Sequence, residues 1–260
     1  MLGVYLSGPT DGPLVILCHG VTDSAASLSH AIGLFNTRYR VAAIDTLGHG
    51  ISPRLTSDEA HTPFAACVDH LHETVCALTS QYGAAYAVGH SMGGALLTAV
   101  AHRCPEAFRA IVLEDPAWLT SEQVAHYAQS LAATIEPLRV HDNQAEVLAS
   151  NRAEYPTWPE EERLAWLQAK YAVDPHILQA GEVGLLEPWR TICPTLTVPC
   201  LLVTSDTDDV LITREHLAHI AQMHNPLIST AIIPGLRHCI RRENPSAFHK
   251  RVAAYFDAHR

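Results

Sequence analysis

The chain has 260 residues, enough to bury a full hydrophobic core in one domain with room for an insertion. Its 48% hydrophobic and 17% charged residues exclude a disordered or collagen-like chain. Lys and Arg number 17 against 27 Asp and Glu, so the formal net charge is −10. This charge argues against nucleic acid or an anionic membrane surface as the main partner, because both select basic surfaces.

The sequence shows no sign of membrane insertion or secretion. It has no run of the roughly 18 apolar residues that a membrane span needs. Its first residues form neither a basic region nor the apolar run of a signal peptide. The 7 cysteines are scattered and form no Cys-x-x-Cys pair, which is typical of a reducing compartment. We therefore expect a cytoplasmic protein, monomeric or homodimeric, that acts on a small molecule.

Short apolar runs alternate with longer helical patterns over much of the chain, which predicts a parallel α/β sheet. The run Leu14–Cys18 is continuously apolar, as expected of a strand covered on both faces. Further strands are expected at about 4–6, 39–44, 84–88, 110–113, 200–204 and 229–233. Helices are expected at about 24–37, 62–78, 91–104, 213–223 and 246–259.

The pattern changes after Pro116. From there to about Arg190 there are helix signals, including a possible capping box at Thr120, and no convincing strand. All 4 tryptophans lie in this segment. We expect a core formed by residues 1–115 and 191–260, interrupted by a helical cap at 116–190.

Residues 89–93 read Gly-His-Ser-Met-Gly, between an expected strand and an expected helix. The two glycines allow a sharp turn with Ser91 at its apex. The start of the helix directs free N–H groups and the positive end of its dipole toward the same place. The pattern therefore predicts that Ser91 is a nucleophile.

A serine hydroxyl needs a base, and the base needs an acceptor for its second ring nitrogen. His238 follows the strand expected at 229–233, and loops after parallel strands hold the ligands of α/β sheets. The acidic turn 205–209 follows the strand at 200–204, and we choose Asp208 from it as the acid. Asp115, at another strand end, is the second choice.

Two backbone N–H groups are expected to stabilise an oxyanion. One belongs to Met92, directly after the nucleophile. The other belongs to Val21, in the loop after the first long strand, where Gly20 permits a tight turn. We interpret His19 as a structural residue that hydrogen-bonds this loop.

These motifs occur in the order found in α/β-hydrolases, and the chain resembles that family over nearly its whole length. The resemblance implies a mostly parallel sheet of eight strands, or of seven because the first strand is short or absent. It also implies flanking helices, a helical cap over the active site, and no cofactor. Transferred by position, the catalytic residues are Ser91, Asp208 and His238, with Val21 and Met92 forming the oxyanion hole.

The substrate is expected to be a small molecule with an acyl group: a carboxylic ester, lactone or thioester cleaved through an acyl-enzyme. The alternatives are a carbon–carbon bond hydrolase, a cofactor-free perhydrolase of the haloperoxidase type, or a non-catalytic ligand receptor. Among the cap aromatics, Trp118 and Trp158 are the candidates for substrate binding. We expect no metal site, since the pairs His70/His72 and His216/His219 are interpreted as surface histidines.

Overall fold

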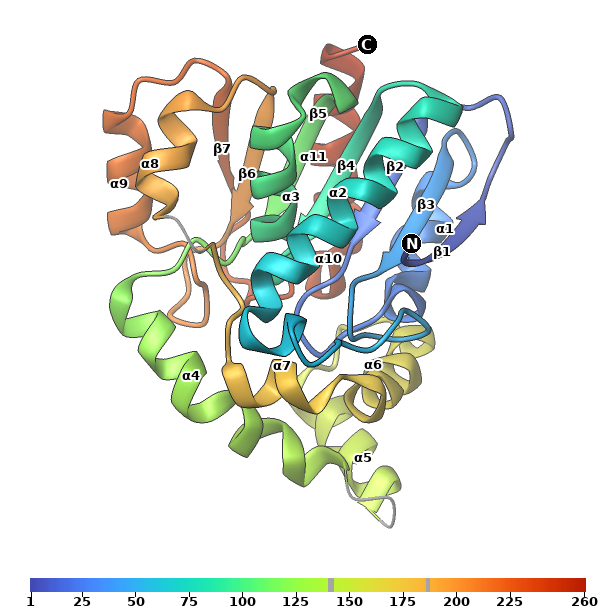
Figure 1. Cartoon of the computed structure of the whole chain (residues 1–260), viewed down its shortest axis with the longest axis vertical. Coiled ribbons are helices and arrows are strands. Elements are labelled where there is room, and N and C mark those ends of the chain that lie inside the picture. The colour runs from blue at the N-terminus through green and yellow to red at the C-terminus, as the bar shows by residue number, and fades with distance from the viewer. Residues whose placement is uncertain (140–142, 186–187) are drawn as a thin grey trace.

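A computed structural model describes residues 1–139, 143–185 and 188–260. These residues form a seven-stranded sheet in the order β1-β3-β2-β4-β5-β6-β7 (Figure 1). The edge strand β1 is antiparallel to β3, and every other pair is parallel. The α/β-hydrolase fold is confirmed, with seven strands rather than eight. The strands are β1 (Gly3–Ser7), β2 (Leu14–Cys18), β3 (Arg40–Asp45), β4 (Ala85–His90), β5 (Phe108–Glu114), β6 (Cys200–Thr204) and β7 (Ile228–Ile232).

Two apolar layers cover the sheet because successive side chains of a strand point to opposite faces. In β2, Ile16 belongs to one layer and Leu17 to the other, and both are buried. Helices α2 and α3 pack on the first face, while α1 and α11 pack on the second (Figure 1). The core helices are α1 (Ser29–Phe35), α2 (Pro63–Tyr82), α3 (Met92–Arg103), α9 (Arg214–Gln222), α10 (Ile240–Glu243) and α11 (Pro245–Ala258).

The segment between β5 and β6 contains helices and no strand within its described residues. Its first helix begins with a capping box in which Thr120 Oγ1 accepts the backbone N–H of Gln123 at 3.3 Å. The helices are α4 (Ser121–Ile135), α5 (Gln144–Glu154), α6 (Glu160–Ala172), α7 (Pro175–Ala180) and α8 (Trp189–Ile192). Helices α4 to α7 lie beyond the carboxyl ends of the strands, at the bottom of Figure 1, whereas α8 lies beside α9. We refer to α4–α7 as the cap.

None of the described helices combines the length and the apolar character that crossing a bilayer requires.

Candidate active site

Ser91 lies in the turn that joins β4 to α3. Its backbone has φ 53° and ψ −119°, a conformation that residues with side chains rarely adopt. A Cβ atom on Gly93 would lie 2.5 Å from the carbonyl oxygens of Cys18 and His19, so only glycine lets α3 approach the end of β2 this closely. The turn is thus held rigidly, with Ser91 at the edge of a cavity.

The ring of His238 is oriented by Asp115. Its Nδ1 lies 2.6 Å from Asp115 Oδ2. The expected pairing with Asp208 is wrong: Asp208 is exposed, and no described contact joins it to His238. Asp115, the second choice from sequence, follows β5 directly and is fully buried. His238 and Ser91 line the same cavity.

Four hydrogen bonds fix the Asp115 carboxylate. Besides the bond to His238, its Oδ2 accepts the backbone N–H of Leu211 at 2.8 Å. Its Oδ1 accepts the N–H of Ile212 and the hydroxyl of Thr204, both at 3.0 Å. Because donors surround both oxygens, the hydrogen bonds hold the carboxylate in one orientation beside the imidazole.

The acidic turn from which Asp208 was chosen supports the backbone of the histidine loop instead. Asp206 Oδ1 accepts the N–H of Gly235 at 2.7 Å, and Asp209 Oδ2 accepts the N–H of His238 at 3.2 Å. The hydroxyl of Thr207 donates to the carbonyl of Leu236. These contacts position the loop without touching the His238 ring.

The surroundings of His238 favour its protonated form. Burial alone lowers the pKa of an imidazole, but the hydrogen bond and negative charge of Asp115 outweigh burial and raise the pKa of His238. An ion pair of this kind stabilises the imidazolium that forms when the base takes a proton.

His90 is a site residue that sequence reasoning missed. Its ring centroid lies 4.6 Å from that of His238, and its Nε2–H donates to the His238 carbonyl at 3.2 Å. Burial holds the pKa of His90 well below its usual value, so this ring places no second charge beside the base. His90 occupies a variable position of the Gly-x-Ser-x-Gly pattern, so the pattern itself gives no signal for it.

The loop after β2 touches the serine turn. A Cβ atom on Gly20 would lie 3.3 Å from Ser91 Cβ, so the N–H of the next residue, Val21, starts close to the nucleophile. Met92 is the first residue of α3, where an N–H has no acceptor within its helix. Both N–H groups fit the oxyanion-hole hypothesis, which stays a prediction. His19 bonds this region as expected: its Nδ1–H donates to the Gly20 carbonyl at 2.8 Å.

A cavity of about 690 Å³ separates the serine turn from the cap. Trp158 lines this cavity, together with Tyr127, Tyr155 and Trp166. Trp118 does not. It is fully buried in the core, where its Nε1–H donates to Thr98 Oγ1 at 3.0 Å and its ring stacks on that of Trp189. The interpretation of Trp118 as a substrate contact is therefore wrong.

Charged side chains form one wall of the cavity. Arg242 donates to Asp23 Oδ2 at 2.8 Å and to Glu162 Oε2 at 2.7 Å, and all three side chains are buried. Lys170 Nζ donates to the carbonyl and hydroxyl of Thr22, at 2.8 and 3.1 Å. Burial lowers the pKa of Lys170 to about 8.

Of the four histidines interpreted as surface residues, His216 is buried, whereas His70, His72 and His219 are partly exposed. His216 is buried, its Nε2–H donating to the Trp118 carbonyl at 2.9 Å, so its assignment to the surface is wrong. His72 is only partly exposed and lies beside Cys76.

Comparison with known proteins identifies the family of this chain. The pattern of the family described as "Serine aminopeptidase, S33" matches residues 11–245. The chain belongs to this family of α/β hydrolases. As an S33-family protein, it is a serine hydrolase.

Relatives of this S33-family hydrolase act on different compounds. It is 27% identical to an (E)-2-((N-methylformamido)methylene)succinate hydrolase of Acinetobacter baylyi, over 95% of this chain and 91% of the relative. The structure of E-2-(acetamidomethylene)succinate hydrolase superimposes with a TM-score of 0.76 and 21% identity, over 98% of this chain and 95% of that one. Naproxen esterase of Bacillus subtilis superimposes with a TM-score of 0.71 and 20% identity, over 97% and 86%.

Proposed function

We propose that the protein cleaves a small carboxylic ester, lactone or thioester through a Ser91–His238–Asp115 triad and an acyl-enzyme. The observation that carries this proposal is the 2.6 Å contact between His238 and Asp115, at a cavity that the strained Ser91 turn also lines. A serine becomes nucleophilic only when an oriented base can take its proton.

The reaction follows from these positions. Ser91 Oγ attacks the acyl carbon while His238 Nε2 takes the hydroxyl proton, and Nδ1–H stays hydrogen-bonded to Asp115. The N–H groups of Val21 and Met92 stabilise the oxyanion. His238 then protonates the leaving group, and next takes a proton from the water that releases the acid and frees Ser91.

Two measurements test the proposal. The first is intact-protein mass spectrometry after treatment with a fluorophosphonate, and the second is hydrolysis of 4-nitrophenyl acetate, butyrate and octanoate. We expect one adduct, located on Ser91, and ester turnover that Ser91→Ala abolishes while thermal stability changes little. Normal turnover by Ser91→Ala would refute the mechanism. An adduct without ester turnover would favour carbon–carbon hydrolysis or perhydrolysis, and ligand-induced stabilisation with neither would favour a receptor.

A second candidate function concerns the substrate rather than the mechanism: hydrolysis of an acyl compound that carries a carboxylate. Lys170 is buried beside the cavity and forms no ion pair among the described residues, since the nearby Asp23 carboxylate is bound by Arg242 and Arg241. Arg242, by contrast, is paired with two carboxylates. A buried ammonium without a paired anion is stabilised when a ligand supplies one. The relatives named as hydrolases of succinate derivatives act on such anions.

The chain offers a matched control for this candidate, because Lys170 and Lys250 are its two lysines and Lys250 is exposed on α11. Mono-4-nitrophenyl succinate and 4-nitrophenyl butyrate share a leaving group and differ by one carboxylate. We expect Lys170→Met to lower kcat/KM about tenfold for the anionic ester only, equivalent to ~1.4 kcal/mol. Lys250→Met should leave both values unchanged. An equal loss on both esters, or none, would refute the anion-binding role.

A further inference from the structure

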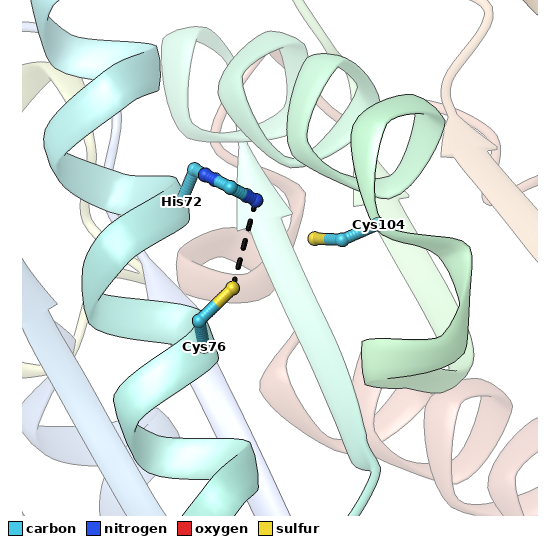
Figure 2. Close-up of side chains that lie close together, drawn as sticks. All are labelled: His72, Cys76 and Cys104. Carbon is cyan, nitrogen blue, oxygen red and sulfur yellow. Dashed lines mark hydrogen bonds between the residues drawn. The ribbon is translucent and has the colours of Figure 1, made fainter.

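A cluster of metal-ligating side chains lies away from the cavity, between α2 and α3. His72, Cys76 and Cys104 point toward one another (Figure 2). Their ligand atoms all lie within 4.8 Å of one another. We propose that these three side chains bind a zinc-type divalent cation, with a fourth coordination position left to water.

His72 and Cys76 are already spaced as a ligand pair. They are four residues apart on α2, so they share one face of the helix. His72 Nε2 lies 3.5 Å from Cys76 Sγ. Zinc bonds of about 2.0 Å to nitrogen and about 2.3 Å to sulfur, at a tetrahedral angle, place the two ligand atoms roughly 3.5 Å apart. The separation of this pair therefore already matches that of two ligands of one zinc ion.

Cys104 supplies the third ligand from the end of α3. Its thiol is buried and donates to the Val100 carbonyl at 3.2 Å. On binding, each thiol releases its proton to solvent and coordinates as a thiolate, while His72 coordinates through its Nε2 lone pair.

The charged side chains described beside the cluster include a pair of opposite sign. The adjacent Arg103 is engaged by Asp69 of α2 in an ion pair between the same two helices. Cys76 is exposed, which leaves water access to the fourth position.

The expected role of this site is structural. Helix α3 runs from Met92, next to the nucleophile, to Arg103, a length of about 18 Å. A cation at its far end bridges α3 to α2 and takes no part in the chemistry at Ser91. The proposal is therefore independent of the proposed function.

Cobalt(II) tests the site because it reports its ligands spectroscopically. Reduced, metal-free protein is titrated with Co²⁺ under anaerobic conditions, and Zn²⁺ is then added. We expect tetrahedral d–d bands and a thiolate-to-cobalt charge-transfer band that saturate at one equivalent and disappear on adding Zn²⁺. Zn²⁺ alone should raise the thermal midpoint of the wild type.

Variants assign the ligands. Cys76→Ser and His72→Gln change side chains that are not buried, so the fold should be retained, and circular dichroism checks this. Cys76→Ser should weaken or remove the charge-transfer band, and both variants should lower affinity at least tenfold. The control is His61→Gln, an exposed histidine just before the same helix, which should bind like the wild type. Absence of the band at one equivalent, or an unchanged band in Cys76→Ser, would overturn the proposal.

Discussion

Two carboxylates follow strands close to His238, and they differ in burial and in hydrogen bonding. Asp115 is fully buried and accepts donors from Thr204, Leu211 and Ile212 as well as from the imidazole. Asp208 is exposed to solvent. A charge in water is screened and mobile, whereas a buried carboxylate held by several donors keeps one direction. This contrast separates the two candidates experimentally.

Asp115→Asn should lower kcat roughly 10³–10⁴-fold, because an amide can neither hold the required tautomer nor stabilise the imidazolium. Asp208→Asn should leave kcat within about twofold, because it removes an exposed charge that makes no contact with the ring. Steady-state hydrolysis of 4-nitrophenyl butyrate by the two variants measures the difference. A large loss of kcat in Asp208→Asn, together with a normal kcat in Asp115→Asn, would show that Asp208 is the acid of the triad.

The raised pKa of His238 predicts the direction of the pH dependence. Only the neutral imidazole can take the Ser91 proton, so activity is lost as pH falls through this pKa. Since Asp115 raises the pKa above the usual 6.5, the acid limb of kcat/KM should lie above pH 6.5. In Asp115→Asn, the acid limb of the remaining kcat/KM should move to lower pH. A limb that stays in place in that variant would show that Asp115 does not set the pKa.

At the scale of elements, the serine turn depends on how closely α3 approaches β2. The contact of Gly93 with the Cys18 and His19 carbonyls leaves no space for a methyl group. The loop that begins at His19 continues to Gly20 and Val21, so a shift of α3 would also move the expected oxyanion donors. Stability and catalysis are therefore coupled through one backbone contact.

Gly93→Ala should destabilise the protein by about 1–3 kcal/mol, because the new methyl group must displace main chain. It should also lower kcat. Gly33→Ala is the matched control: Gly33 lies within α1, and a Cβ there meets nothing within 4 Å. That substitution should be neutral or stabilising by up to ~1 kcal/mol. Urea unfolding of both variants measures the two effects, and equal stabilities would contradict the packing argument.

The sequence predicts the strands, the serine turn and the histidine loop, because apolar runs and glycine positions are local signals. The sequence does not show which of Asp115 and Asp208 orients His238, since the loops after β5 and β6 meet at the same edge of the sheet. The deciding donors, the N–H groups of Leu211 and Ile212, belong to a turn whose path no local pattern specifies. Trp118 was misplaced for a similar reason: its partner Trp189 is distant in sequence.

At the scale of the whole molecule, Arg242 joins the core to the cap. It belongs to α10, which begins two residues after His238, and it binds Asp23 of the β2 loop and Glu162 of cap helix α6. Its guanidinium also lies 4.7 Å from the ring centroid of Trp158. Three segments distant in the chain therefore meet at one buried cation.

Arg242→Met should destabilise the protein by roughly 3–5 kcal/mol, because it removes the cation paired with buried Glu162 and leaves buried Asp23 only its longer contact with Arg241, at 3.6 Å. The control is Arg103→Met, which removes an exposed ion pair with Asp69 and should cost at most about 1 kcal/mol. Denaturant unfolding compares the two variants. Similar losses would show that the buried cation is not essential to the joint between core and cap.

The same joint also affects how the molecule responds to salt. The Arg242–Glu162 pair that fastens α6 to α10 is buried, so dissolved ions screen it only weakly. Exposed pairs such as Arg103–Asp69 are screened much more strongly. The attachment of the cap beside the loop that carries His238 should therefore survive an increase in ionic strength that weakens the surface pairs.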